Sequence, residues 1–341
     1  MHTGILSRRD FLKLSGLSLF ALFLYNLNPG KAMAAPTSRQ GRVVYNSLIV
    51  RNAPGFSGSR VKSCRRDSIL KISEQVFGGV NSDYNRIWYR VGDEEYVYSG
   101  GVQPVATLHN DAVKGIPETG VLGEITIPYA DSVWGINRSP APGPRLYYAS
   151  THWISALVVD KRDASLWYRA FDNLYNSYYY TRPESVHILS AAELSPLSPQ
   201  LPESEKHIEI SLDRQILVAF ESNVPVFTAR VATGQVHYET PTGWFRTFHK
   251  RPTYHMTGGA DVTTVFDLPG VPWDSYFTDS GPAMHGTYWH NDFGHPHSHG
   301  CVNMTPQDAR WIYRWTLPSV PNGERFILKP GEGTRVLISQ S

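Results

Sequence analysis

Alternating apolar and polar residues predict short β-strands in the C-terminal part of the chain. In residues 207–212 every second side chain is apolar, which is the pattern of a strand with one buried face. Residues 216–220 form an apolar run typical of a buried strand, and residues 226–234 predict the next strand. We therefore predict a mainly β domain over residues 203–341.

One helix is predicted inside this domain, directly after residue 304. Thr305 is a suitable N-cap, Pro306 suits the first helical position, and Asp308 stands three residues after the cap. This combination is a sequence signature of a helix N-terminus.

Two further β units are predicted upstream. Residues 41–105 alternate short strands with turns, and residues 48–55, 88–91 and 96–99 resemble the start and end of a bacterial Src-homology-3-like domain. Such a domain is a small barrel, and because a fold alone does not specify a ligand, we favour a spacer over a glycan-binding module.

Residues 106–193 repeat this theme. The sequence WYRAFD at 167–172 echoes WYRVGD at 88–93, which predicts a second, diverged barrel of the same kind. Residues 194–202 contain three prolines and predict an extended linker, because proline lacks a backbone donor and restricts φ.

The N-terminal segment 1–34 has the pattern of an export signal. Arg8 and Arg9 lie in a stretch that resembles the twin-arginine motif, an apolar run covers 14–27, and Ala-Met-Ala at 32–34 is a cleavage signal. A retained membrane anchor is the alternative, but the run is short and polar for a span. We expect cleavage after Ala34, the twin-arginine translocase as a partner, and a location in the periplasm, the cell wall or at the extracellular face.

Composition and charge exclude one class of partner. The chain has 41% hydrophobic, 12% aromatic and 18% charged residues, as in globular proteins. Its net charge is +2, and the predicted signal contributes +3, so the mature chain carries about −1. This balance gives no electrostatic signature of nucleic-acid binding.

Candidate chemistry is concentrated in residues 284–304, which hold five of the thirteen histidines and one of the two cysteines. Their centre is Ser-His-Gly-Cys at 298–301, and His285 precedes Cys301 at a limited distance in the chain. A nearby imidazole can accept the proton of a thiol and activate it as a nucleophile. Gly300 permits a sharp turn that directs backbone amides at an oxyanion.

Two other interpretations of these residues compete. Two cysteines in an exported protein often form a disulfide, here Cys64 with Cys301. Alternating side chains of a strand share a face and suggest a metal site, but no recognised metal motif accompanies them. The residues of that hypothetical metal site are His295, His297, His299 and Cys301, and His290 is near them in the chain.

The motif resembles the catalytic domain of YkuD-like L,D-transpeptidases, in which a histidine is followed by a Ser/Thr-His-Gly-Cys signature. The strands above and the sequence TPTGWF at 240–245 resemble further features of that family, and the resemblance implies a terminal strand at 335–338. The resemblance implies a YkuD-like β-sandwich over residues 203–341, with a short helix after the cysteine.

The resemblance also implies roles for these residues. Cys301 would be the nucleophile and His285 the base, oriented by the Gly286 carbonyl, whereas His299 would shape the pocket. We favour His285 over His299 as the base, although a base must reach the thiol and spacing cannot show this. Ser298 and Asn303 would hold the loop by side-chain hydrogen bonds, and Gly300 and Cys301 would supply oxyanion amides.

The implied reaction is acyl transfer between peptidoglycan stem peptides without a cofactor or a metal. A tetrapeptide donor would lose D-alanine to form a thioester on Cys301, and an amine acceptor would complete a 3→3 cross-link. Carbapenems would be covalent inhibitors, and acylation would slow below about pH 6 as a histidine base becomes protonated. The alternatives are an L,D-carboxypeptidase, a papain-like wall peptidase, in which the cysteine precedes the histidine, and a wall-binding protein without catalysis.

Overall fold

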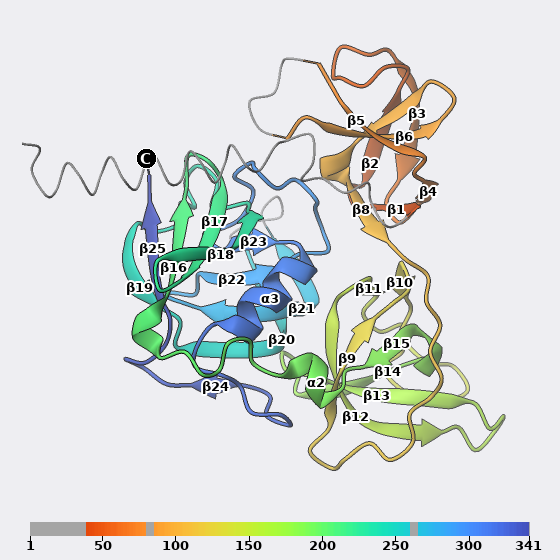
Figure 1. Cartoon of the computed structure of the whole chain (residues 1–341). Helices are drawn as coiled ribbons and strands as arrows, with labels where there is room; N and C mark the ends of the chain where they lie inside the picture. The colour runs from red at the N-terminus through yellow and green to blue at the C-terminus, as the bar shows by residue number, and fades with distance from the viewer. Residues whose placement is uncertain (1–38, 80–84, 260–264, 341) are drawn as a thin grey trace, which may run out of the picture. The chain divides into compact units, whose positions relative to one another are not determined.

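The computed structural model describes residues 39–79, 85–259 and 265–340 (Figure 1). The export signal predicted at 1–34 lies outside the described residues. In the described part of the chain, no helix combines the length and apolar character needed to cross a bilayer. The fold is mainly β, as predicted.

Residues 40–105 form two antiparallel sheets around a small core of Val43, Val50, Val97 and Val102. The strand orders are β4-β1-β8 and β3-β2-β7-β6-β5. The strands are β1 (Gln40–Val43), β2 (Ser47–Arg51), β3 (Arg60–Arg65), β4 (Ile69–Lys71), β5 (Glu74–Phe77), β6 (Ile87–Gly92), β7 (Glu95–Tyr98) and β8 (Val102–Val105), with a 3-10 turn at Ser99–Gly101. The assignment of this region to the Src-homology-3-like class remains a prediction.

Residues 121–188 form a sheet of order β14-β13-β12-β9-β15 and a two-stranded ribbon, β10-β11. Leu122, Trp153 and Leu189 of this region join the hydrophobic core of the C-terminal domain. The elements are β9 (Val121–Ile125), β10 (Tyr129–Ala130), β11 (Leu146–Tyr147), β12 (Thr151–Val159), β13 (Leu166–Asp172), β14 (Ser177–Thr181), β15 (Val186–Ile188) and a 3-10 turn at Pro183–Ser185.

The proline-rich segment is docked along the C-terminal domain. It follows α2 (Ala191–Leu194), whose N-cap Ser190 forms a capping box with Glu193. Leu194 and Leu197 pack against the core, and the Leu197 amide donates to the Arg314 carbonyl at 2.9 Å. A 3-10 turn at Glu203–Glu205 then leads into the last domain.

The C-terminal domain contains two sheets, of order β18-β17-β16-β25-β19 and β23-β22-β21-β20-β24. The strands predicted at 207–212, 216–220, 226–234 and 335–338 correspond to β16, β17, β18 and β25 in the first sheet. The strands are β16 (Lys206–Ser211), β17 (Ile216–Glu221), β18 (Val224–Arg230), β19 (Gly243–Arg246), β20 (His249–Gly258), β21 (Phe266–Tyr276), β22 (Ala283–Gly286), β23 (Val302–Met304), β24 (Ile327–Leu328) and β25 (Arg335–Ser339).

Helix α3 (Pro306–Trp315) begins where the sequence predicts, with the Thr305 hydroxyl accepting the Asp308 amide at 3.1 Å. It lies against β21 and β22 (Figure 1) and contributes Ile312 to the core shared by both sheets. Because β23 leads directly into this helix, packing of α3 against the core also holds the end of the segment that contains the cysteine motif.

Two buried lysines close the C-terminal end of α3. Lys250 donates to the carbonyls of Tyr313 and Thr316, and Lys206 donates to the Trp315 carbonyl at 3.1 Å. Cations at this end complement the helix dipole and satisfy carbonyls that lack an intrahelical partner. Burial lowers the pKa of both ammonium groups.

Candidate active site

Parallel pairing of β22 with β23 brings the two halves of the motif together. His285 on β22 is in register with Asn303 on β23, and Cys301 immediately precedes β23. Neighbouring strands lie about 4.8 Å apart, so the His285 and Asn303 side chains are direct neighbours. Residues 287–301 separate the two strands in the sequence, but pairing within the sheet places the strands side by side.

His285 is buried, with 2% of its surface exposed, and its Nδ1 lies 3.1 Å from the Gly286 carbonyl oxygen. A carbonyl only accepts, so Nδ1 carries the proton and the lone pair stands on Nε2. Burial lowers the pKa of the imidazole to about 4, opposed by the Gly286 contact. His285 is therefore a neutral base at pH 7.

Cys301 is a free thiol in a partly exposed residue. Desolvation raises the pKa of the thiol to about 11, while a hydrogen bond from the Ala283 backbone lowers it and the Asp274 carboxyl raises it further. In the described residues no hydrogen bond joins the thiol to His285. The free site thus holds a neutral thiol and a neutral imidazole rather than an ion pair.

The loop before the cysteine is held by Ser298, as the sequence suggests. Its hydroxyl donates to the Cys301 carbonyl at 2.5 Å and accepts the Gly300 amide at 3.1 Å. Gly300 has a φ of 107°, a conformation that side-chain-bearing residues rarely adopt, and its carbonyl accepts from Thr240 at 3.0 Å. These contacts explain why a glycine precedes the cysteine.

His299 occupies a different environment from His285. Its ring is exposed and lies against two aromatic rings, with centroids 4.4 Å from Tyr238 and 5.5 Å from Phe266. This contact matches a pocket-shaping role, and His285 has the more defined tautomer. The assignment of His285 as the base remains a prediction.

The structure adds His290 to the site, a residue that the sequence pattern offers only as a neighbour of a metal cluster. His290 is 1% exposed, its Nε2 lies 2.9 Å from Nδ2 of Asn303, and its Nδ1 accepts the Asp292 amide at 3.2 Å. Burial lowers its pKa well below the ordinary histidine value. Two hydrogen bonds therefore position a neutral ring beside Asn303.

Asp292 connects this loop to the N-terminal sheets. Its carboxylate accepts the Tyr98 phenol at 2.5 Å and the Asn85 amide at 3.3 Å. The amide of Asn291 donates to the Gly100 carbonyl at 2.9 Å. No sequence signal pairs segments so far apart in the chain, so these contacts were not predicted.

The structure supports neither of the other two interpretations. Cys64 and Cys301 are both free, so the disulfide is not formed. No group of three or more histidine, cysteine, aspartate or glutamate residues within 39–79, 85–259 and 265–340 is placed to hold a metal ion.

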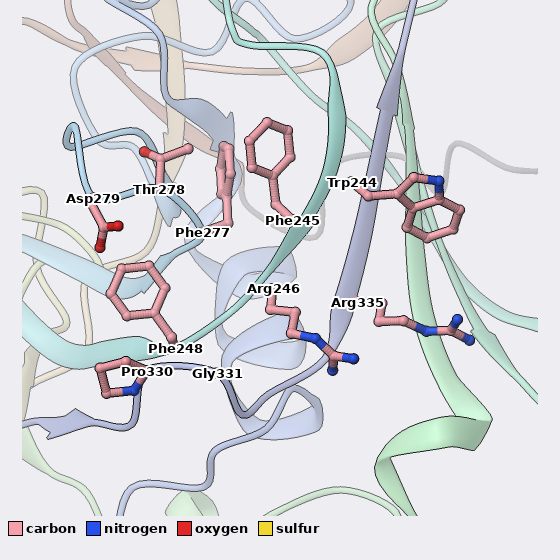
Figure 2. Close-up of a pocket in the computed structure, with 10 residues that line it drawn as sticks. All are labelled: Trp244, Phe245, Arg246, Phe248, Phe277, Thr278, Asp279, Pro330, Gly331 and Arg335. Atoms are coloured by element: carbon pink, nitrogen blue, oxygen red, sulfur yellow. The ribbon is translucent and has the colours of Figure 1, made fainter.

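None of the motif residues lines a separate groove of about 690 Å³ in the same domain. Figure 2 shows Phe245 and Phe277 side by side in it, with centroids 5.5 Å apart, and the guanidinium groups of Arg246 and Arg335 at one end. Its turn at 277–279 precedes Ala283, the hydrogen-bond partner of Cys301. Cys301 and His285 do not line this groove.

Residues 205–338 match the YkuD family, described as the L,D-transpeptidase catalytic domain. A search of curated proteins found no match.

Three solved structures illustrate the similarity. An Enterococcus faecium L,D-transpeptidase C442S mutant is 20% identical over 41% of this chain, with a TM-score of 0.32, and the match spans 51% of that chain. The L,D-transpeptidase (residues 123–326) from Xylanimonas cellulosilytica is 28% identical over 40% of this chain and 62% of its own, with a TM-score of 0.30. L,D-transpeptidase 3 from Mycobacterium tuberculosis with a faropenem-derived adduct is 18% identical over 49% of this chain and 74% of its own, with a TM-score of 0.32.

The family match covers both halves of the motif, the two sheets that support them and the helix that follows. Residues 205–338 are a YkuD L,D-transpeptidase catalytic domain.

Proposed function

We propose that this protein is a cysteine-dependent L,D-transpeptidase that forms 3→3 cross-links between peptidoglycan stem peptides. The observation that carries the proposal is the arrangement of Cys301, His285 and the Gly286 carbonyl in a YkuD domain. A base whose tautomer is fixed by a carbonyl can accept a thiol proton on its free nitrogen.

The reaction proceeds in two balanced steps. The Cys301 sulfur attacks the carbonyl carbon of the third stem residue, and its proton passes to Nε2 of His285. The tetrahedral intermediate expels D-alanine, whose amine takes that proton, and leaves a thioester. An amine of a second stem then attacks the thioester and restores the thiol, so the acyl energy is conserved without ATP. Backbone amides at Gly300 and Cys301 are the oxyanion donors in this scheme.

The proposal includes a location and partners. Twin-arginine export through Arg8 and Arg9 would place the domain in the periplasm or at the wall, where stem peptides occur. The partners would be a tetrapeptide donor, an amine acceptor and, as covalent inhibitors, carbapenems. The strained amide of a β-lactam presents the same kind of carbonyl to Cys301, and its leaving group stays attached after the ring opens. For this reason we include carbapenems as covalent inhibitors.

The test is incubation of the mature protein with defined tetrapeptide muropeptides, followed by mass analysis. We expect a cross-linked dimer with loss of one D-alanine, which is absent in Cys301→Ala and retained in the matched control Cys64→Ser. Tripeptide without dimer would identify an L,D-carboxypeptidase, which uses the same site with water as the acceptor. Unchanged muropeptides from folded protein would contradict the proposal and favour a wall-binding role.

A further inference from the structure

The contact between His290 and Asn303 would place two hydrogen-bond donors opposite each other. His290 accepts the Asp292 backbone amide at Nδ1, and a backbone N–H cannot act as an acceptor. A neutral imidazole has one donor and one acceptor, so Nε2 must carry the proton. The Asn303 group 2.9 Å from Nε2 must then accept this hydrogen bond, but the amide NH2 that stands there can only donate.

The conflict disappears when the Asn303 amide is flipped, so that its oxygen and nitrogen exchange places. These two ends of an asparagine amide have nearly the same shape, so the hydrogen-bond network decides its orientation. In the flipped orientation Oδ1 accepts from Nε2 of His290. The NH2 group then takes the position of an atom that is buried and has no hydrogen-bond partner among the described residues.

A buried donor without a partner is unfavourable, by about 1–3 kcal/mol, unless a ligand satisfies it. Asn303 is 2% exposed and is in register with His285 on the neighbouring strand. Cys301 immediately precedes β23 and stands two residues before Asn303 in the chain. The unsatisfied donor therefore lies beside His285 on the sheet and close in the chain to Cys301.

We infer that Asn303 donates an amide N–H to the carbonyl oxygen of the acyl donor bound at Cys301, and that His290 is the residue that positions this amide. The inference rests on the proposed acyl transfer and names one further donor for it. His290 contributes through its tautomer, because only the Nε2–H form holds the amide with its NH2 toward the substrate.

The main test separates carbonyl chemistry from thiol reactivity. Asn303→Asp keeps an acceptor for His290 and removes the donor that faces the substrate. Loss of one oxyanion-type donor typically lowers rates by about 10²–10³. We expect acylation of Cys301 by faropenem to slow by about that factor, while alkylation by iodoacetamide, which creates no oxyanion, changes by less than about threefold.

Asn291→Asp is the matched control, since it makes the same chemical change in the loop that precedes β23, at an amide that donates to the Ser99 carbonyl. It should leave the ratio of the two rates unchanged. Equal losses of acylation and alkylation in Asn303→Asp would show a structural effect only and would overturn the inference.

A second measurement does not depend on activity. Nitrogen-15 shifts of the His290 ring should show the Nε2–H tautomer from pH 5 to pH 8. An Nδ1–H tautomer, or titration near pH 6.5, would overturn the positioning role of His290. If wild-type protein reacts with iodoacetamide but not with faropenem or stem peptides, the proposed function is wrong. The tautomer of the His290 ring would still show whether His290 can orient the Asn303 amide.

Discussion

The most direct test of the site is the pH dependence of Cys301. Burial raises the pKa of the thiol to about 11 and lowers that of His285 to about 4. At pH 7 a thiol with such a pKa is thiolate to about one part in 10⁴, compared with about 3% for an ordinary cysteine of pKa ~8.5. The higher intrinsic nucleophilicity of a more basic thiolate recovers roughly a factor of ten.

Two rate profiles follow from these values. Iodoacetamide, which reacts with the thiolate, should alkylate Cys301 roughly 30-fold more slowly than a small thiol at pH 7, and the rate should rise about tenfold per pH unit up to about pH 10. Faropenem acylation uses neutral thiol and neutral His285, so it should be flat above about pH 5. Since the His285 pKa is lowered, the base is lost only as the pH falls through about 4.

The assay is mass spectrometry of the intact Cys64→Ser protein, which leaves Cys301 as the single thiol of the mature chain. An alkylation profile that is half-maximal between pH 5 and 7 would refute the reasoning, because it would reveal a thiolate–imidazolium pair in the free enzyme. The sequence alone predicts a decline below about pH 6, whereas burial of His285 moves that limit to about pH 4.

The remaining predictions concern the base, the contact with the N-terminal sheets and export. His285→Ala should lower the acylation rate by about two to four powers of ten, as loss of a general base does, and normal acylation would transfer the role to another group. Tyr98→Phe should lower the free energy of unfolding by about 1.5–3 kcal/mol, because the phenol donates to the buried Asp292 carboxylate; an unchanged urea midpoint would contradict this. Replacement of Arg8 and Arg9 by lysine should trap the precursor in cell fractionation, and normal export would exclude the twin-arginine route.

The sequence predicts those parts of the site that are encoded locally. Ser298, Gly300 and Cys301 are contiguous enough to define their own loop, and the Thr305 cap is a short-range signal. Alternation of apolar residues likewise locates β16 to within one residue at each end. These features depend on neighbours within a few positions, which a single sequence displays.

The sequence does not predict contacts created by strand pairing and by the packing of distant segments. Strand pairing places His285 beside Asn303, and the loop between the strands folds back so that Nε2 of His290 lies 2.9 Å from Nδ2 of Asn303. The contact of Tyr98 with Asp292 spans 194 positions and follows no periodicity. The raised pKa of Cys301 is similarly a property of its surroundings, because desolvation is the largest cause and no residue type encodes it.

These long-range contacts bear on which reagents the site can activate. The free site keeps the thiol and His285 neutral and poorly solvated, so creating a thiolate in the absence of a substrate is unfavourable. With a carbonyl substrate, negative charge moves from sulfur to the oxyanion, where the amides of Gly300 and Cys301 and the Asn303 side chain are the candidate donors. An alkylating agent offers no such oxygen and gains nothing from those donors. The arrangement therefore favours acyl transfer over general thiol chemistry, because the charge is stabilised where a carbonyl develops it and not on the resting cysteine.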